Sequence, residues 1–521
     1  MKRRTMAIRV LVLALAGIFS AVSYAELQNV EVGGSIRIRA RSFENSFDTL
    51  SGTPPRALRI PMFFLPERPI GPFGTNTHYD WSTRGNDRNF LEESARLNVR
   101  ADFTNDVSSF VELRTYGMWG RDFRSNYITG QDTRFYQAST AYLYQGYIQT
   151  DNTFGYPLTL RLGRQELHMG KGWLIGSKIG IQDRSYDAIR LTYSEAPLTV
   201  EAFAAKLLER GTREQDGDTD LYGIYGTYAV CKECNASLYW YLVRDGRRQN
   251  DTNFAWFPER VEDAFGVDDY DPTNMNTVGT RLWGAYAGWD YDLELAYQFG
   301  NADSVGVLFK TGTYGDDRAS YGHAAADLEV GYRFDVKYQP RVFVGGAYYG
   351  GEDKRGISFW QWLSPFDRPE ASVSFNRLFP DSAYNEVIDN HRTLSNFNQI
   401  RMGVSAKPWE KVTTALSVSH FEANARFDRP RTFSVGRFAV PVAPSLSFWT
   451  KQSSGDLGYL TDFSVKYDYS SDLYFRFVWQ HMFTGSGLSE GNFVIGQGLE
   501  YSGGTGHDDA DYFCFDTGIT F

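Results

Sequence analysis

The sequence predicts an all-β protein, a transmembrane antiparallel β-barrel of about 18 strands, with about 16 as the alternative count. Three observations predict this fold: an export signal at the N-terminus, an alternating apolar row at the C-terminus, and an unusual composition. Aromatic residues make up 16% of the chain and 50 residues are glycine, yet the mean hydropathy is −0.41. Such a composition suits strands that have one lipid face and one wet face.

Residues 1–25 have the pattern of a secretory signal peptide. Basic residues between Lys2 and Arg4 precede an apolar run over residues 10–22, and Ser23-Tyr24-Ala25 supplies small residues where a signal peptidase cuts. The apolar run is short for a membrane-spanning helix of about 20 residues. We therefore expect cleavage after Ala25, with Glu26 as the first residue of the mature chain.

The C-terminus has the pattern of a final barrel strand. Phe513, Phe515, Thr517, Ile519 and Phe521 alternate with smaller or polar residues. Such a row can face lipid, and pairing of this strand with the first strand would remove the exposed edge. Together with the export signal, the row predicts the outer membrane of a Gram-negative-type, diderm bacterium, with its lipid as a partner.

Residues 26–521 are predicted to form one barrel domain in which long extracellular loops alternate with short periplasmic turns. The short turns are expected at Thr104-Asn105-Asp106, Glu195-Ala196-Pro197, Lys232 to Asn235 and Ser470-Ser471-Asp472. The long segments are expected at Phe43–Asn89, Asp245–Asn276, Asp353–Ser395 and Phe427–Gly455.

Cysteine content and charge exclude several function classes. Cys231 and Cys234 form a CxxC pair without a second pair or a histidine cluster, which favours a small disulfide across a turn over a zinc site or redox chemistry. The net charge of −10 argues against a nucleic-acid partner. No serine–histidine spacing resembles a barrel hydrolase. We expect no metal, no cofactor and no enzymatic activity.

Strand alternation assigns the basic residues to the lumen, because arginine on the lipid face costs about 2–4 kcal/mol at the membrane midplane. In the first strand, for example, Ile36 and Ile38 belong to the apolar row, so Arg37 and Arg39 belong to the other row. The lumen arginines predicted by alternation are Arg37, Arg39, Arg41, Arg96, Arg100, Arg114, Arg161, Arg190, Arg281, Arg401 and Arg476. They either form cross-strand ladders with lumen acids or line a constriction that attracts anions.

The stretch from Leu160 to Tyr193 reads LRLGRQELHMGKGWLIGSKIGIQDRSYDAIRLTY. It resembles the alginate export family of outer-membrane proteins, which show a strand ending in Gly-Arg-Gln-Glu-Leu, a Gly-rich loop and an Arg-x-x-Asp-x-x-Arg-Leu strand start. The matching residues are Gly163, Arg164, Gln165, Glu166, Leu167, Gly170, Leu174, Gly176, Arg184, Asp187, Arg190 and Leu191. A weaker match runs from 277 to 300, and the family domain would cover roughly residues 28 to 521.

This resemblance implies a monomeric, 18-stranded barrel with an electropositive constriction that passes a polyuronate. By position, Arg164, Arg190 and Arg281 become the main constriction candidates, beside Arg37 and Arg39. One departure is that His168-Met169-Gly170-Lys171 stands where the family commonly has Tyr-Gly-Asp after Gln-Glu-Leu.

The motif has two open interpretations. Strict alternation from Leu162 would aim Arg164 at lipid, so its lumen position requires a bulge or the end of the strand. Alternatively, the motif folds a loop inward as a plug, in which Glu166 and Arg184 form an ion pair.

Three functions follow as hypotheses. The first is a passive pore that exports or conducts an anionic polysaccharide or another anion, with periplasmic export components as further partners. The second is an uptake porin for small solutes. The third is a plugged barrel that anchors surface partners through its long loops.

Overall fold

The computed structural model describes residues 26–45, 87–120, 125–126, 131–132, 141–209, 218–246, 273–301, 319–351, 371–390, 392, 394–425, 431–435, 438–442, 454–488, 493–495, 500–502 and 509–521. The expected signal peptide and most of the four long segments lie outside these ranges. Among the described residues, no helix is long and apolar enough to cross a membrane.

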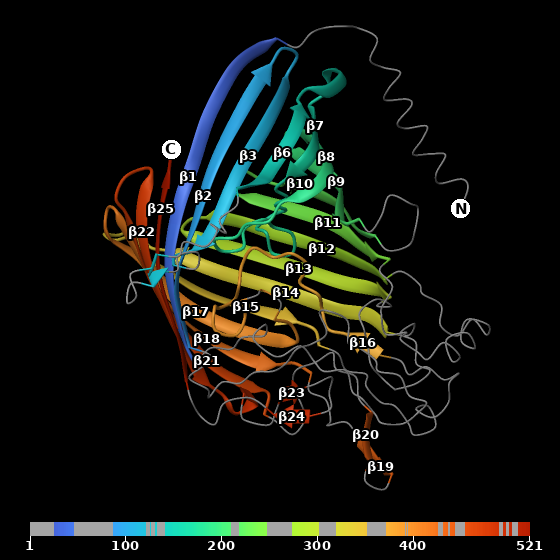
Figure 1. Ribbon diagram of the computed structural model, residues 1–521, viewed down its shortest axis with the longest axis vertical. Helices are drawn as coiled ribbons and strands as arrows, with labels where there is room; N and C mark the ends of the chain where they lie inside the picture. Colours follow the sequence, from blue (N-terminus) through green and yellow to red (C-terminus); the bar gives the residue numbers. More distant parts are fainter. Residues whose placement is uncertain are drawn as a thin grey trace, which may run out of the picture.

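The wall is a closed antiparallel barrel of 18 strands, which confirms the predicted fold class and the higher of the two counts. The strands follow one another around the wall in chain order, and blue β1 lies against red β25 (Figure 1). They are β1 (Leu27–Glu44), β2 (Arg88–Phe103), β3 (Val107–Met118), β6 (Tyr142–Thr150), β7 (Leu158–Gln165), β8 (Tyr186–Glu195), β9 (Leu198–Leu208), β10 (Thr219–Ala229), β11 (Cys234–Asp245), β12 (Thr273–Tyr286), β13 (Trp289–Asn301), β14 (Ala319–Arg333), β15 (Arg341–Tyr349), β17 (Phe397–Trp409), β18 (Val412–Ala423), β21 (Asp456–Asp468), β22 (Leu473–Thr484) and β25 (Ala510–Thr520).

Seven short strands accompany the wall. β16 (Ala371–Val373) pairs in parallel with β14. The other six form three hairpins: β4 (Ser125–Asn126) with β5 (Gln131–Asp132), β19 (Arg431–Val435) with β20 (Phe438–Val442), and β23 (Phe493–Ile495) with β24 (Glu500–Ser502).

The two faces of the wall have the polarity that lipid demands. On β1, Ile36 is 43% exposed, whereas Arg39 is only 7% exposed. On β8, Ile189 is 57% exposed. An apolar row that is open to the outside, with a charged row enclosed within, inverts the pattern of a soluble protein and matches a barrel whose outer row contacts acyl chains.

Short connections join the strands at the end of the barrel where β1 begins. The expected turns after β2, β8, β10 and β21 all occur there, and Cys231 and Cys234 are joined by a disulfide in the turn between β10 and β11. Because short turns are periplasmic in outer-membrane barrels, this end faces the periplasm.

Two connections at the opposite end fold back into the barrel. The first covers residues 166–185 between β7 and β8, and the second covers the described residues between 374 and 396, from β16 to β17. Leu174 and Ile175 of the first segment and Phe375 of the second are almost completely buried, in one apolar cluster with Tyr349 of the wall. Together we call the two segments the lumen bridge.

The two segments of the lumen bridge pair with each other through their backbones. Ile175 and Phe379 form a parallel β-bridge. The amide of Gly176 donates to the carbonyl of Phe379 at 2.8 Å, and the amide of Phe379 donates to the carbonyl of Leu174 at 2.8 Å. Residues from two distant loops therefore form one folded unit inside the wall.

Candidate functional site: a bridge across the lumen

The first segment of the lumen bridge is held against β1, β2 and β3 by arginines that the alternation had placed in the lumen. Nη1 of Arg37 donates to the carbonyl oxygen of Gly180 at 2.6 Å. Arg114 is fully buried and donates to the carbonyl oxygens of Ile181 and Asp183. Arg96 forms an ion pair with the carboxylate of Asp183. These guanidiniums position a loop that crosses the lumen.

The same segment reaches the opposite wall through Lys171. Its Nζ lies 2.7 Å from Oδ1 of Asp327 on β14 and 3.3 Å from Oδ1 of Asp292 on β13. Gly170, beside it, has φ of +60°, and a Cβ there would lie 2.5 Å from the hydroxyl of Tyr225 on β10. A glycine is therefore needed for the bridge to approach this wall closely.

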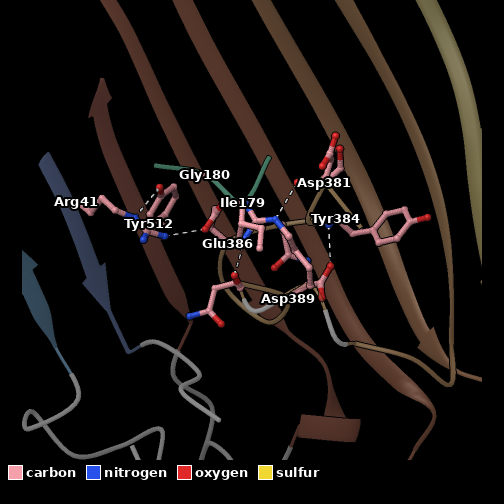
Figure 2. Close-up of polar contacts among 12 residues, drawn as sticks. Arg41, Ile179, Gly180, Asp381, Tyr384, Glu386, Asp389 and Tyr512 are labelled. Carbon is pink, nitrogen blue, oxygen red and sulfur yellow. Dashed lines mark hydrogen bonds and ion pairs between the residues drawn. The ribbon is translucent and has the colours of Figure 1, made fainter. Parts of the chain in front are cut away.

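The second segment makes a parallel set of anchors (Figure 2). Arg41 of β1 lies 2.7 Å from a carboxylate oxygen of Glu386. Tyr384, at the other side, donates from its hydroxyl to Asp327 at 2.9 Å. Between these anchors, Arg377 and Asp389 form a buried ion pair at 2.6 Å. Both segments thus connect β1 with β14.

Asp381 joins the two segments to each other. Its carboxylate lies 2.7 Å from Nδ1 of His168 and accepts a hydrogen bond of 2.6 Å from the backbone amide of Lys178. A Cβ on Gly176 would lie only 1.9 Å from Oδ1 of Asp381, and a Cβ on Gly172 would lie 2.4 Å from its Oδ2. The two glycines of the first segment therefore leave the space that this buried side chain fills.

Most of the predicted lumen arginines have a carboxylate partner in the barrel wall or on the bridge. The pairs are Arg37 with Asp516, Arg39 with Glu92, Arg41 with Glu386, Arg96 with Glu112 and Asp183, Arg100 with Asp102, Arg190 with Glu201, Arg281 with Asp292, and Arg401 with Glu329. Among the described residues, Arg114, Arg161 and Arg476 have no carboxylate within ion-pair distance. Of these, Arg161 contacts Gln149 and lies over the ring of Tyr147.

The lumen position expected for Arg164 is wrong. Arg164 pairs with Asp187 across β7 and β8, and Leu162 pairs with Ile189 on the same outer row. Both members of the Arg164–Asp187 ion pair, at 2.8 Å, are exposed. Alternation continues through Gly163 without the bulge that a lumen position requires, so Arg164 projects to the outer face near the end of its strand.

The remaining motif residues shape the entry into the bridge. Gly163 has φ of +128°, and a Cβ there would lie 2.3 Å from the carbonyl oxygen of Gly146. Gln165 is buried and donates to the carbonyl of Ala188 at 2.9 Å. Glu166 accepts a hydrogen bond from Tyr144 at 2.6 Å. The motif therefore leads into a loop that folds inward, as the second of its two interpretations predicted.

The expected Glu166–Arg184 ion pair does not form. The guanidinium of Arg184 lies instead over the ring of Phe379, 5.0 Å from its centroid, and also contacts the hydroxyl of Tyr186. Arg184 therefore packs against the second segment of the bridge, and it does not pair with the acid of its own segment.

Sequence reasoning missed the second segment of the bridge. Its anchors, Asp381, Tyr384, Glu386 and Asp389, fall in a stretch that was expected to be a long extracellular loop. This stretch has no strand alternation, and only the density of acids and aromatics between 374 and 396 sets it apart. Its partners lie far away in the chain: Lys178 and Asp381 are 203 residues apart.

Two cavities follow the β13–β14 wall beside the bridge. One, of about 240 Å³, lies between bridge and wall and is lined by Lys171, Trp173, Tyr384 and Arg401. The other, of about 600 Å³, extends to the turn that contains Lys232 and Glu233. Asp292 and Glu329 line both cavities, so the two adjoin each other between the bridge and the short-turn end.

A closed barrel with an apolar outer row and a charged, water-facing interior belongs to the class of outer-membrane pores. More specifically, the chain belongs to the alginate export family, because the family model described as "Alginate export" matches residues 73–502. Family and fold are those of outer-membrane pores, which are non-enzymatic.

The structure is also similar to solved outer-membrane structures at low sequence identity. OpdL of Pseudomonas aeruginosa is 9% identical with a TM-score of 0.50, over 95% of this chain and 99% of that chain. OccAB4 of Acinetobacter baumannii is 8% identical with a TM-score of 0.48, over 95% and 99%. At these identities the likeness to OpdL supports the fold alone. No curated protein matches the sequence.

Proposed function

We propose that the chain is a passive outer-membrane pore that conducts anions past the lumen bridge. The observation that carries the proposal is the uneven pairing of lumen charges. Along the two cavities beside β13 and β14, each carboxylate has a cation within ion-pair distance: Asp290 has Arg341, Asp292 has Arg281, Asp327 has Lys171, and Glu329 has Arg401. Those charges largely cancel.

Elsewhere around the wall, some guanidiniums have no carboxylate to balance them. Arg37, Arg39, Arg41, Arg96, Arg100 and Arg190 are paired. Among the described residues, Arg114, Arg161 and Arg476 have no carboxylate within ion-pair distance, so their positive charge is not cancelled by an ion pair. Fixed positive charge in a narrow aqueous path raises the local concentration of anions.

The size of the cargo follows from the bridge. Because two segments cross the lumen and are anchored on both walls, we infer that small organic anions pass more readily than a polysaccharide chain. Passage of an anionic polysaccharide would require the bridge to move. Liposome swelling with monomeric and oligomeric uronates would measure this size limit directly.

The sign of the selectivity is tested in planar bilayers under a salt gradient. The purified barrel should give a reversal potential that reports anion preference. Arg161→Gln combined with Arg476→Gln should lower that preference, because neither guanidinium has a carboxylate to release. Arg164→Gln is the matched control, since this arginine projects from the outer face. Cation preference of the unmodified barrel would overturn the proposal.

A plugged barrel that anchors surface partners is the second candidate, and the ties between bridge and wall favour it. Single-channel recordings separate the two. Discrete conductance steps from the folded, unmodified barrel support the pore, whereas complete absence of conductance supports the plugged barrel.

A further inference from the structure

β1 extends well beyond its neighbour β25 at the short-turn end of the barrel. The pairing of the two strands ends at Ser35 with Thr520, and Gly34 and Phe521 exchange two backbone hydrogen bonds of 2.9 and 3.0 Å. On its other side β1 continues to pair with β2, as far as Leu27 with Phe103. In Figure 1, the blue strand accordingly extends past the C-terminus.

Residues 27–33 therefore have a paired edge and an edge that no described strand covers. Both backbone groups of Gly34 point toward β25, and in a strand every second residue repeats this direction. The amide and carbonyl groups of Val32 and Val30 consequently point to the uncovered side. Unpaired backbone groups in a row are a template for another strand, and they are costly where lipid lies near.

The side chains beside this edge define what would fit. Val32 is 66% exposed and Val30 is 49% exposed, on the apolar outer row. On the lumen row, Glu31 is exposed and accepts a hydrogen bond of 3.2 Å from Asn29. Among the described residues, no cation forms an ion pair with Glu31. The edge thus offers an apolar side and an acidic side.

We propose that residues 27–33 of β1 bind an extended segment of a periplasmic protein by strand addition. The segment would run antiparallel to β1, in line with β25, and would alternate apolar residues beside the valines with basic residues beside Glu31. A second copy of this chain fits less well, because its own edge would bring another Glu31 carboxylate to the same place. The proposal rests on the outer-membrane placement of the barrel, which turns this end to the periplasm.

Hydrogen exchange tests whether the edge is open in the full mature barrel in lipid nanodiscs. The amides of Val30 and Val32 should exchange fast, while those of Glu31 and Gly33, which face β2, should exchange slowly. Slow exchange of all four amides in the unliganded barrel would overturn the proposal.

Binding is tested with a fluorescent seven-residue synthetic peptide of alternating lysine and valine, followed by anisotropy and by exchange. Saturable binding should protect the amides of Val30 and Val32. Val30→Pro with Val32→Pro removes two edge donors but leaves the pairing with β2, and should weaken binding at least about tenfold, because several backbone hydrogen bonds are lost. The matched control, Val30→Thr with Val32→Thr, keeps the donors and should retain binding.

Further controls separate edge binding from other effects. Glu31→Gln should weaken binding of the lysine–valine peptide and leave binding of a serine–valine peptide unchanged. Anisotropy of the peptide with nanodiscs that contain no barrel measures its insertion into lipid alone. Equal binding to the proline and threonine variants, or to empty nanodiscs, would contradict strand addition. Conductance of each variant, recorded separately, reports on the pore, so either proposal can fail without the other.

Discussion

Nδ1 of His168 lies 2.7 Å from Oδ2 of Asp381, and this contact joins two loops that leave the barrel wall between different strand pairs. Asp381 is nearly buried, while the imidazole is half exposed. The carboxylate also accepts from the amide of Lys178. The contact therefore ties the two segments of the lumen bridge together.

Loss of the Asp381 carboxylate should loosen the bridge. Asp381→Ala removes the charged acceptor of the Lys178 amide, and a hydrogen bond to a charged group contributes about 1.5–3 kcal/mol. Since about 1.4 kcal/mol is tenfold in an equilibrium, the open population of the bridge should rise about tenfold, seen as larger or noisier single-channel currents. Lys178→Ala is the control, because only its backbone contacts Asp381. Unchanged currents in Asp381→Ala would show that this contact does not hold the bridge.

Gly176→Ala should have the same effect from the other side of the contact. A methyl group there would lie 1.9 Å from Oδ1 of Asp381, so the carboxylate or the loop has to move. Gly322→Ala in β14 is the matched control, because a Cβ at that position meets no atom within 4 Å. Single-channel recordings of both variants decide the matter: wild-type currents from Gly176→Ala would contradict a tightly filled contact.

Removal of the Lys171 charge should shift the selectivity toward cations. The ammonium group of Lys171 lies beside Asp327 and Asp292, both of which line the smaller cavity. Lys171→Met keeps much of the side-chain volume and leaves Asp327 without its ion-pair partner among the described residues. The reversal potential under a salt gradient should move in the cation-selective direction, and Asp327→Asn in the same background should restore it. An unchanged reversal potential in Lys171→Met would show that ions do not pass close to Lys171.

The mature chain should begin at Glu26. The basic start, the apolar run and Ser23-Tyr24-Ala25 predict cleavage after Ala25, and β1 begins at Leu27 directly after this point. Intact-mass measurement of the barrel purified from outer membranes gives the N-terminus. Ala25→Leu should block processing and leave a heavier product in the inner membrane. An intact mass that corresponds to another N-terminal residue would show that cleavage does not occur after Ala25.

The wall of the barrel could be predicted from sequence because lipid imposes a period of two on each strand. Rows such as Ile36 and Ile38 against Arg37 and Arg39 give the strand, its faces and its place in the count. The period of two also predicts that Arg164 faces outward, whereas the family resemblance predicts that Arg164 faces the lumen. In the structure Arg164 faces outward, as the alternation predicts.

The lumen bridge could not be predicted in the same way. Alternation gives the face of an arginine but not its partner, so the contacts of Arg37 with Gly180 and of Arg114 with Ile181 had no signal in the strand pattern. The second segment lacks periodicity because it lies in the lumen as irregular backbone, held by side chains from β1, β13 and β14. Its position depends on pairs such as Lys178 and Asp381, which only the closed barrel brings together.

The buried pair of Arg377 and Asp389 should be the strongest single tie of the second segment. Their side chains are 2% and 0% exposed, and Asp389 also accepts from the backbone amides of Tyr384 and Leu394. Arg377→Met leaves a buried carboxylate without its cation, a change that costs about 3–5 kcal/mol when one partner of such a pair is removed. The segment should then become sensitive to added protease in the folded barrel. Arg377→Met combined with Asp389→Asn removes both charges and should recover part of the protection, since no unpaired charge is left buried. If the single variant resists protease as well as the unmodified barrel does, the apolar contacts of Phe375 and Leu394 hold the segment without the ion pair.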